Sequence, residues 1–257
     1  MIRSIVLASL ICASAALAQT PATGKTEITW IGHAAFLLKT PAGTTIAIDP
    51  FIKGNPTAPK DLKLPAKIDA ILVTHAHGDH VGDAKELADK HGAVVIGSFE
   101  LVSLLAVKNN AGGNAGGTVA VKDDVLVHMV EAVHSSGFGA DPAKAQYGGA
   151  PLGFVIQIKG GPTVYHAGDT DVFASMQLIG TRYQPTIGLL PIGGHFTMDP
   201  EGAALAAKLL GLKTVIPMHF ATFPPLVGTP AQLKDSLKKA KSTATVVEMK
   251  PGETKTF

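Results

Sequence analysis

The segment Thr74-His75-Ala76-His77-Gly78-Asp79-His80 places four potential metal ligands within six residues. It directly follows the mostly apolar run Ile-Asp-Ala-Ile-Leu-Val at positions 68–73, which is typical of a buried strand. On an α-helix, side chains two positions apart point about 200° away from each other, so His75 and His77 would not face one ion there. We therefore predict a loop at the tip of a strand, where both imidazoles can turn the same way.

The chemistry of these four side chains indicates a metal site. Imidazole nitrogens and carboxylate oxygens are the ligand atoms that zinc and its first-row neighbours accept. Two adjacent pairs, His75 with His77 and Asp79 with His80, are more than one ion needs from one loop, so the motif favours two ions. The alternative is a histidine-rich surface loop, which would leave four potential ligands at the end of a strand unexplained.

The motif resembles the HxHxDH signature of the metallo-β-lactamase superfamily, and three later segments follow in that family's order. They are Glu-Ala-Val-His-Ser-Ser-Gly at 131–137, Tyr-His-Ala-Gly-Asp-Thr at 165–170 and Ile-Pro-Met-His-Phe at 216–220. Their details resemble the UPF0173 group of metal-dependent hydrolases, which are relatives of the ascorbate-phosphate lactonases. The resemblance runs from about Thr26 to near the C-terminus. It implies an α/β (α+β) fold, namely a four-layer αββα sandwich with a dinuclear site on one edge.

By this resemblance, seven side chains would hold two divalent metal ions. Zinc is the expected metal, with Mn²⁺, Ni²⁺ or Fe²⁺ as alternatives. One ion would take three imidazoles and keep an open position, as catalytic zinc does, while a carboxylate would bridge it to the second ion. The ligands are His75, His77 and His134 for the first ion, Asp79, His80 and His219 for the second, and Asp169 for the bridge. The residues alone predict only the four in the motif, since the other three could be ordinary polar loop residues.

The expected reaction is hydrolysis of a small ester, lactone or phosphoester. A water that bridges two such ions loses a proton near neutral pH, and the metals also polarise the electrophile. Asp79 is predicted to be catalytic as well as a ligand, because it could accept a hydrogen bond from that hydroxide. His33 and His195 resemble family positions near the metal pocket, where they could bind substrate or protonate a leaving group. The alternative for both histidines is to support their loops by hydrogen bonds.

Four other polar residues are expected to have supporting roles. Asp49 stands at the end of a strand and could orient a ligand imidazole through its second nitrogen. His166 is expected to be structural or to support a ligand. His91 and His128 are expected to be solvated or to cap an element.

The sequence leaves other activities open. A β-lactamase would fit an exported protein, but many of those enzymes use a cysteine ligand that this chain lacks. Resemblance to N-acylphosphatidylethanolamine phospholipase D keeps a phosphodiesterase possible, and a metal-binding protein without turnover is a third alternative. Redox chemistry is disfavoured, because His77 stands where the superfamily's di-iron oxygen reducers tend to carry glutamate.

Residues 1–18 are predicted to be a secretory signal peptide. They combine a cationic start at Arg3, an apolar run at 5–17 and a small-x-small cleavage site that ends at Ala18. A retained anchor is disfavoured, because the run is shorter than the roughly 20 residues of a spanning helix. We expect a periplasmic or secreted protein. Its mature chain would have no cysteine, since the single one, Cys12, lies in the signal.

The remaining chain, 19–257, is predicted to be a single hydrolase domain, since 46% of all residues are hydrophobic and its length allows one large core. A formal charge of +2 without a long basic run argues against nucleic acid as a partner. A small-molecule substrate is the expected partner. No membrane span is expected after the signal, and a homo-oligomer is possible.

The order of elements suits two sheets covered by helices on both outer faces. Strands are expected at 27–31, 35–39, 45–49, 68–73, 93–96, 118–121, 125–133, 153–158, 163–165, 186–191, 214–216 and 245–248, and helices at 84–91, 199–211 and 229–239. The glycine-rich segment 111–117 is expected to lack regular structure. The long segment 135–151 is expected to form a substrate-binding loop or lid.

Overall fold

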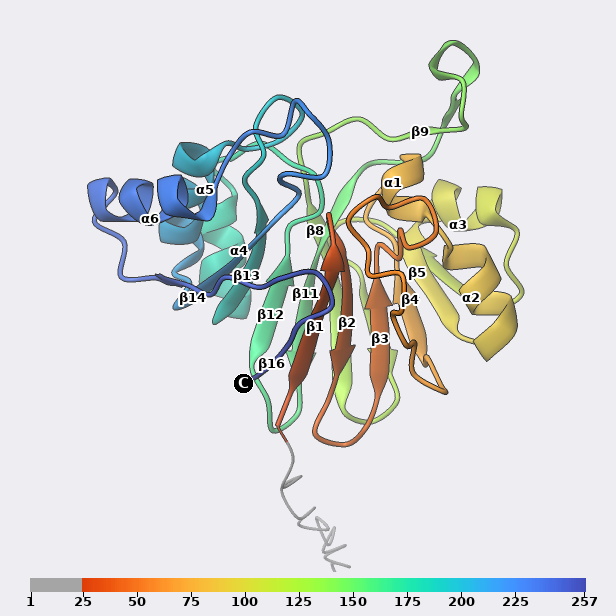
Figure 1. Cartoon of the computed structure of the whole chain (residues 1–257). Helices are drawn as coiled ribbons and strands as arrows, with labels where there is room; N and C mark the ends of the chain where they lie inside the picture. The colour runs from red at the N-terminus through yellow and green to blue at the C-terminus, as the bar shows by residue number, and fades with distance from the viewer. Residues whose placement is uncertain (1–24) are drawn as a thin grey trace, which may run out of the picture.

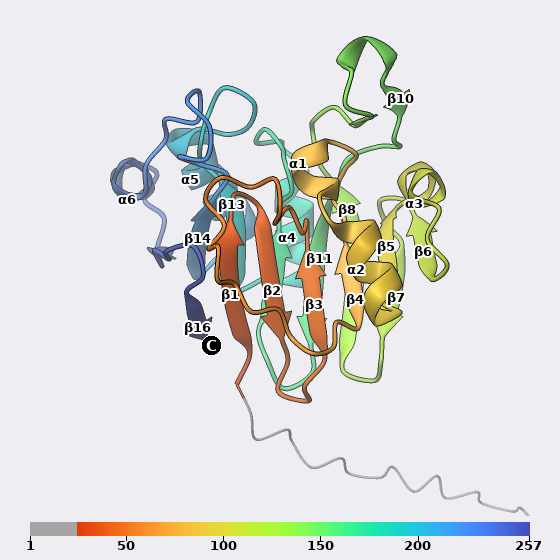
Figure 2. The same ribbon diagram turned by 45° about the vertical axis from the view of Figure 1, so that its right-hand side comes forward.

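The computed structural model describes residues 25–257, and the predicted signal peptide lies outside the described residues. Two seven-stranded sheets pack face to face, and helices cover both outer faces (Figures 1 and 2). This arrangement confirms the predicted αββα sandwich. Among the described residues, no helix combines the length and apolar composition that crossing a bilayer requires.

The first sheet has the strand order β16-β1-β2-β3-β4-β5-β6. Its strands are β1 (Glu27–Gly32), β2 (Ala35–Lys39), β3 (Thr45–Ile48), β4 (Ala70–Leu72), β5 (Val94–Ser98), β6 (Asn110–Gly113) and β16 (Thr254–Thr256). The strands β3 to β6 pair in parallel, whereas β16, β1, β2 and β3 pair antiparallel.

The second sheet has the strand order β15-β14-β13-β12-β11-β8-β7. Its strands are β7 (Thr118–Val121), β8 (Val125–Glu131), β11 (Leu152–Ile158), β12 (Thr163–His166), β13 (Ile187–Pro191), β14 (Thr214–Met218) and β15 (Thr245–Val246). A separate hairpin, β9 (Gly137–Phe138) and β10 (Gln146–Tyr147), projects from the body of the protein.

The helices divide between the two sheets. They are α1 (Gly78–Val81), α2 (Ala84–His91), α3 (Phe99–Leu105), α4 (Met176–Tyr183), α5 (Pro200–Leu210) and α6 (Pro230–Lys239). Helices α2 and α3 pack on the first sheet, and α4 to α6 cover the second. The predicted cap of α5 is present, because the Asp199 side chain accepts hydrogen bonds from the backbone N–H groups of Glu201 and Gly202.

The apolar core lies on both faces of the first sheet. Along β2, Phe36 and Leu38 belong to the cluster between the sheets, whereas Leu37 belongs to the cluster beneath α2 and α3. Successive side chains of a strand point to opposite faces, so a strand buried on both faces is a continuous apolar run. This double burial explains the mostly apolar stretch before the histidine motif.

Several elements differ from the prediction. The glycine-rich segment begins with an ordered strand, β6, because glycine lets α3 come close: a Cβ on Gly112 would lie 2.5 Å from the Val102 side chain. Helices α3 and α4 and strand β16 were not predicted. The motif is also not entirely a loop, since α1 is a helical turn that carries Asp79 and His80.

One edge of the sandwich collects the ends of several strands. Strands β3 and β4 run in parallel, and β1 has the same direction because two antiparallel pairings separate it from β3. In the second sheet β8, β12 and β14 likewise share one direction. The loops that follow these six strands carry the seven predicted metal ligands together with His33 and Asp49, and they meet at the upper edge in Figure 1.

Candidate metal centre

The seven predicted ligands converge at this edge. Ligand atoms of His75, His77 and His134 lie within 4.8 Å of one another, as do those of three residues predicted for the second ion, Asp79, His80 and His219. His33 also belongs to the second group, and His75, His80 and Asp169 form a third group that joins the other two.

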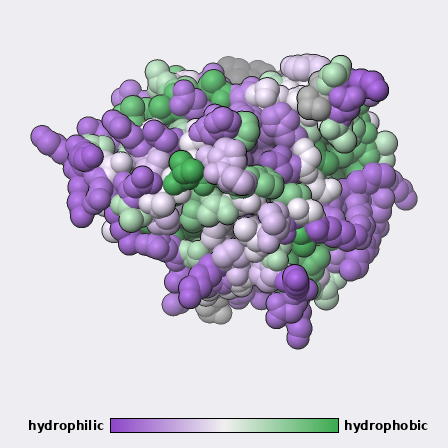
Figure 3. All heavy atoms as spheres, turned by 45° about the horizontal axis from the view of Figure 1, so that its top comes forward, coloured by the Kyte–Doolittle hydropathy of each residue, from purple (hydrophilic) through white to green (hydrophobic). Residues whose placement is uncertain are grey.

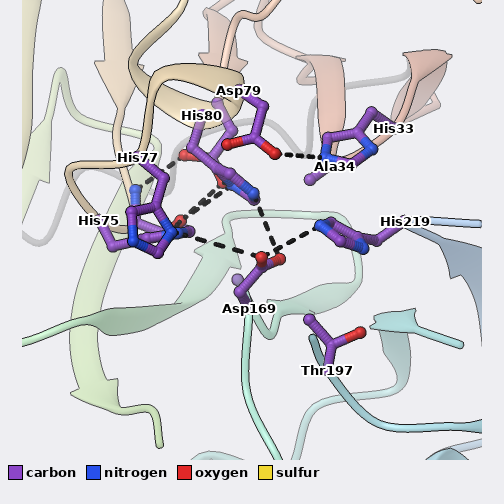
Figure 4. Close-up of polar contacts among 12 residues, drawn as sticks. His33, Ala34, His75, His77, Asp79, His80, Asp169, Thr197 and His219 are labelled. Carbon is purple, nitrogen blue, oxygen red and sulfur yellow. Dashed lines mark hydrogen bonds and ion pairs between the residues drawn. The ribbon is translucent and has the colours of Figure 1, made fainter. Parts of the chain in front are cut away.

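Asp169 lies at the centre of the cluster (Figure 4). Its Oδ1 is 3.2 Å from Nε2 of His80, and its Oδ2 is 3.0 Å from Nε2 of His219. The same Oδ2 is 3.6 Å from His134 Nε2 and 4.0 Å from His75 Nε2. One carboxylate therefore faces imidazoles of both predicted ion sites, as a bridging ligand must.

The backbone before Asp169 leaves no room for a side chain. Gly168 has φ +62°, and a Cβ there would lie 2.8 Å from both the Leu152 carbonyl oxygen and the Thr74 side chain. Glycine at this position therefore lets the Asp169 loop approach the motif loop closely.

Unpartnered polar atoms in the cluster fit a cation. Asp169 Oδ1, His80 Nε2 and both ring nitrogens of His219 are buried without a hydrogen-bond partner. His80 Nε2 is nevertheless within ion-pair distance of Asp169 Oδ1, and His219 Nε2 is within ion-pair distance of Asp169 Oδ2. Buried polar atoms normally have a partner. Donor atoms that lie close together without hydrogen-bond geometry are what a shared metal ion requires, so these residues fit the metals that the motif implies.

A hydrogen-bonded chain fixes which nitrogen each ligand presents. Asp49 Oδ2 accepts from His80 Nδ1–H at 2.7 Å and from the Thr74 hydroxyl at 2.7 Å. That hydroxyl in turn accepts from His75 Nδ1–H at 3.0 Å, and Asp49 Oδ1 accepts from the Thr74 backbone N–H at 2.8 Å. With protons on Nδ1, both imidazoles present Nε2 lone pairs to the cluster. These direct contacts support the predicted role of Asp49 in orienting a ligand imidazole. Thr74 also belongs to this hydrogen-bonded chain, and the sequence did not predict its role.

The charges of the cluster are coupled. Burial alone would raise the pKa of Asp169, but His80 and His219 beside it hold that pKa well below its usual range. Burial alone would lower the pKa of His80, yet Asp169 and Asp49 raise it well above the ordinary value. The two carboxylates therefore favour the protonated form of the His80 ring, and a metal ion at Nε2 would compete with that proton.

The buried His33 ring is held between two hydrogen-bond partners. Its Nε2 lies 3.2 Å from Asp79 Oδ2, and its Nδ1 lies 3.0 Å from the Thr222 hydroxyl. Burial lowers the pKa of His33 to about 4, despite the hydrogen bond to Asp79. The neutral His33 ring donates its Nε2–H to Asp79 and so positions that carboxylate. This contact does not suit the predicted role of His33 in protonating a leaving group.

His195 is not brought to the cluster. Its side chain is exposed, it packs edge-on against Phe196 with ring centroids 4.3 Å apart, and it does not line the cavity beside the ligands. Gly194 and His195 both have left-handed φ values, 73° and 60°, and in this tight turn Phe196, one residue later, borders the cavity instead.

The remaining histidines have structural contacts. His166 Nε2 lies 2.9 Å from the Ala34 carbonyl oxygen, and its Nδ1 accepts from the Gly168 backbone N–H. The expectation of solvated rings is wrong for His91 and His128, which are both buried. His128 joins strands, since its nitrogens contact the side chains of Thr118 and Gln157.

A cavity of about 300 Å³ opens directly beside the predicted ligands. Its walls include His77, Asp79, His134, Asp169 and His219, and three residues that the sequence did not single out, namely Ser135, Phe196 and Phe223. The projecting β9–β10 hairpin belongs to the segment predicted to act as a lid, and that role stays a prediction.

Comparison with known proteins defines the class. A family model described as the beta-lactamase superfamily domain matches residues 27–219, and the chain belongs to this superfamily. A UPF0173 metal-dependent hydrolase of Myxococcus xanthus is 58% identical over 234 residues, which cover 90% of this chain and 83% of the relative. A second UPF0173 metal-dependent hydrolase, from Koribacter versatilis, is 48% identical, and the match covers 97% of that relative. The chain is accordingly a metal-dependent hydrolase similar to the UPF0173 proteins.

Solved structures agree with this class. Igni18, a metallo hydrolase from the archaeon Ignicoccus hospitalis, matches with a TM-score of 0.78 and 39% identity, over 91% of this chain and 99% of that chain. CmlA, a diiron β-hydroxylase from Streptomyces venezuelae, matches with a TM-score of 0.64 at 14% identity, over 91% of this chain and 54% of that one. At that identity the likeness concerns the fold alone, so the reaction has to be argued from the site.

Proposed function

We propose that the chain is a binuclear metal hydrolase that cleaves a small ester, lactone or phosphoester. The observation that carries the proposal is the position of Asp169 between two groups of imidazoles, with unpartnered buried ligand atoms beside an open cavity. We assign His75, His77 and His134 to one ion and Asp79, His80 and His219 to the other. Zinc is the proposed metal, because three imidazoles with an open position are typical of catalytic zinc, and Mn²⁺, Ni²⁺ and Fe²⁺ are the alternatives that nitrogen and oxygen donors also accept.

The side chains prepare the reaction before substrate arrives. Bound divalent cations supply a Lewis acid and lower the pKa of water, as in other binuclear hydrolases. Burial alone would raise the pKa of Asp79, which lines the cavity, but the hydrogen bond from His33 and the nearby His80 and His33 rings together depress that pKa, so the carboxylate keeps its negative charge. We propose that Asp79 accepts a hydrogen bond from the attacking water and that His33 fixes its orientation. The buried Thr74 hydroxyl and the buried Asp49 carboxylate prevent the rings of His75 and His80 from turning.

Metal removal and replacement test this proposal. Purified mature protein should contain two ions per chain, and chelation should reduce hydrolysis of a panel of esters, lactones and phosphodiesters to background. Addition of zinc or manganese should restore it. Elemental analysis and initial rates provide the two readouts. Turnover that persists at full rate in metal-free protein would contradict the proposal, as would saturation at one ion per chain.

Export is a separate proposal that rests on residues 1–18. We expect the protein in a Gram-negative host to appear in the periplasmic fraction with Gln19 as its first residue, because signal peptidase requires a small residue before the cut. N-terminal sequencing checks this. Replacement of Ala18 with arginine should leave the precursor uncleaved, and an intact Met1 on the wild-type protein would argue against a cleaved signal.

A further inference from the structure

The cavity beside the ligands has two kinds of wall. One wall consists of predicted ligands, and the other contains Ser135, Phe196 and Phe223. Ser135 places its hydroxyl 3.4 Å from Nε2 of His77 and is the single lining residue that is neither aromatic nor a predicted ligand. Apart from the reacting centre itself, the cavity therefore offers a substrate one hydroxyl and two phenyl rings.

Fixed positive charge is missing from this region of the described chain. No lysine or arginine occurs in the loops 74–81, 133–139, 168–173, 193–198 and 219–227, which supply the walls. An anionic group at the reacting bond could be neutralised by the metals. A second anionic group at some distance from that bond would lose its hydration on entering the cavity and would find no positively charged side chain there. Such desolvation is unfavourable.

The two phenyl rings are placed for apolar contact. Phe196 is 55% exposed at the mouth of the cavity, and Phe223 packs edge-on against the buried His33 ring with centroids 5.5 Å apart. In Figure 3, which brings the top of Figure 1 forward, apolar and weakly polar residues occupy much of the middle of this face, and strongly hydrophilic ones mostly surround them. Ligand sites typically combine such apolar walls with a few polar groups.

We propose that the substrate is uncharged outside its reacting group and carries an apolar substituent, such as an aryl ring, that binds against Phe196 and Phe223. This inference rests on the proposed hydrolytic function and narrows it. Lactones and esters with a second carboxylate or a phosphate, including phosphorylated sugar lactones, are excluded as good substrates. The cavity volume of about 300 Å³ is at the lower end for small-molecule sites, which also favours a compact substrate.

A matched pair of esters tests the charge preference. The metal-loaded protein should hydrolyse 4-acetoxybenzamide with at least a tenfold higher kcat/KM than 4-acetoxybenzoate, after each rate is divided by the rate of spontaneous hydrolysis. The two esters have nearly the same shape and differ in the charge of the distal group. If the protein hydrolyses neither ester, isothermal titration calorimetry can compare their binding. The Kd of the benzamide ester should then be at least tenfold lower than that of the benzoate ester.

Variants of Phe196 test the apolar contact. Phe196→Ala should raise KM for phenyl acetate about tenfold with little change in kcat, since an apolar contact with the ring, which stays intact in the reaction, contributes mainly to binding. Phe196→Leu should recover most of that affinity. Phe196→Lys should raise kcat/KM for the benzoate ester about tenfold by supplying the missing cation. Leu178→Ala is the control, because Leu178 is 69% exposed on α4 and does not line the cavity.

The outcomes separate this inference from the hydrolase proposal. Equal or faster turnover of the benzoate ester, or an unchanged KM in Phe196→Ala, would overturn the substrate class while metal-dependent hydrolysis stands. Equal Kd values for the two esters would do the same when neither is hydrolysed. Loss of metal-dependent turnover on the whole panel, with a clear binding preference for the neutral ester, would instead overturn the hydrolase proposal and keep the cavity assignment.

Discussion

Asp169→Asn is expected to bind one zinc ion per chain instead of two and to lose about three orders of magnitude in kcat/KM. The carboxamide keeps the shape of the side chain but has one acceptor oxygen and no charge. It can neither bind two cations at once nor offset their mutual repulsion. A loss of this size matches the removal of electrostatic stabilisation from a reacting centre. Elemental analysis after zinc saturation gives the metal count, and initial rates give the activity.

Asp171→Asn is the matched control, because Asp171 lies in the same loop but is exposed and accepts only the Val172 backbone N–H at its Oδ1. This control should keep two ions and full activity. Circular dichroism should show both variants folded at the assay temperature. A folded Asp169→Asn protein that still retains two zinc ions would remove Asp169 from the bridging position.

Local spacing in the sequence was sufficient to predict the first part of the site. His75, His77, Asp79 and His80 lie in one short segment after an apolar strand, so their proximity needs no knowledge of the fold. His134, Asp169 and His219 were predicted from family resemblance only. Their convergence depends on β8, β12 and β14 sharing one direction, which follows from strand pairing and not from local sequence.

Backbone conformation explains what the sequence could not predict. Asp49, His33 and His219 have left-handed φ values of 43°, 54° and 53°, which non-glycine residues seldom adopt. The surrounding packing imposes this strain, and the neighbouring Gly32 and Pro50 indicate a turn beside His33 and Asp49 without showing which residue takes the left-handed conformation. The same limit applies to His195 and Phe196. Chemistry favoured the histidine, but the left-handed turn leaves that ring in solvent while the phenyl ring borders the cavity.

Asp49→Asn is expected to weaken zinc binding about 10- to 100-fold and to lower the free energy of unfolding of the metal-free protein by about 3 kcal/mol. The fully buried carboxylate accepts from the Thr74 backbone N–H, the Thr74 hydroxyl and His80 Nδ1–H. An amide has one oxygen, so its NH₂ group must face at least one of these donors. A buried donor then loses its partner, and the His80 and His75 rings lose the chain that fixes their tautomers.

Two readouts distinguish this positioning role from a purely structural one. Urea unfolding of metal-free protein measures the stability, and competition with a chelator measures the zinc affinity. Asp124→Asn is the control, because Asp124 also accepts from two threonine hydroxyls, those of Thr40 and Thr44, but stands before β8 at the opposite edge. It should lose stability and keep its zinc affinity. Thr74→Ser should bind zinc nearly as wild type, whereas Thr74→Val should weaken it by breaking the link to His75. If Asp49→Asn and Asp124→Asn shifted zinc affinity equally, orientation of the ligands by Asp49 would be refuted.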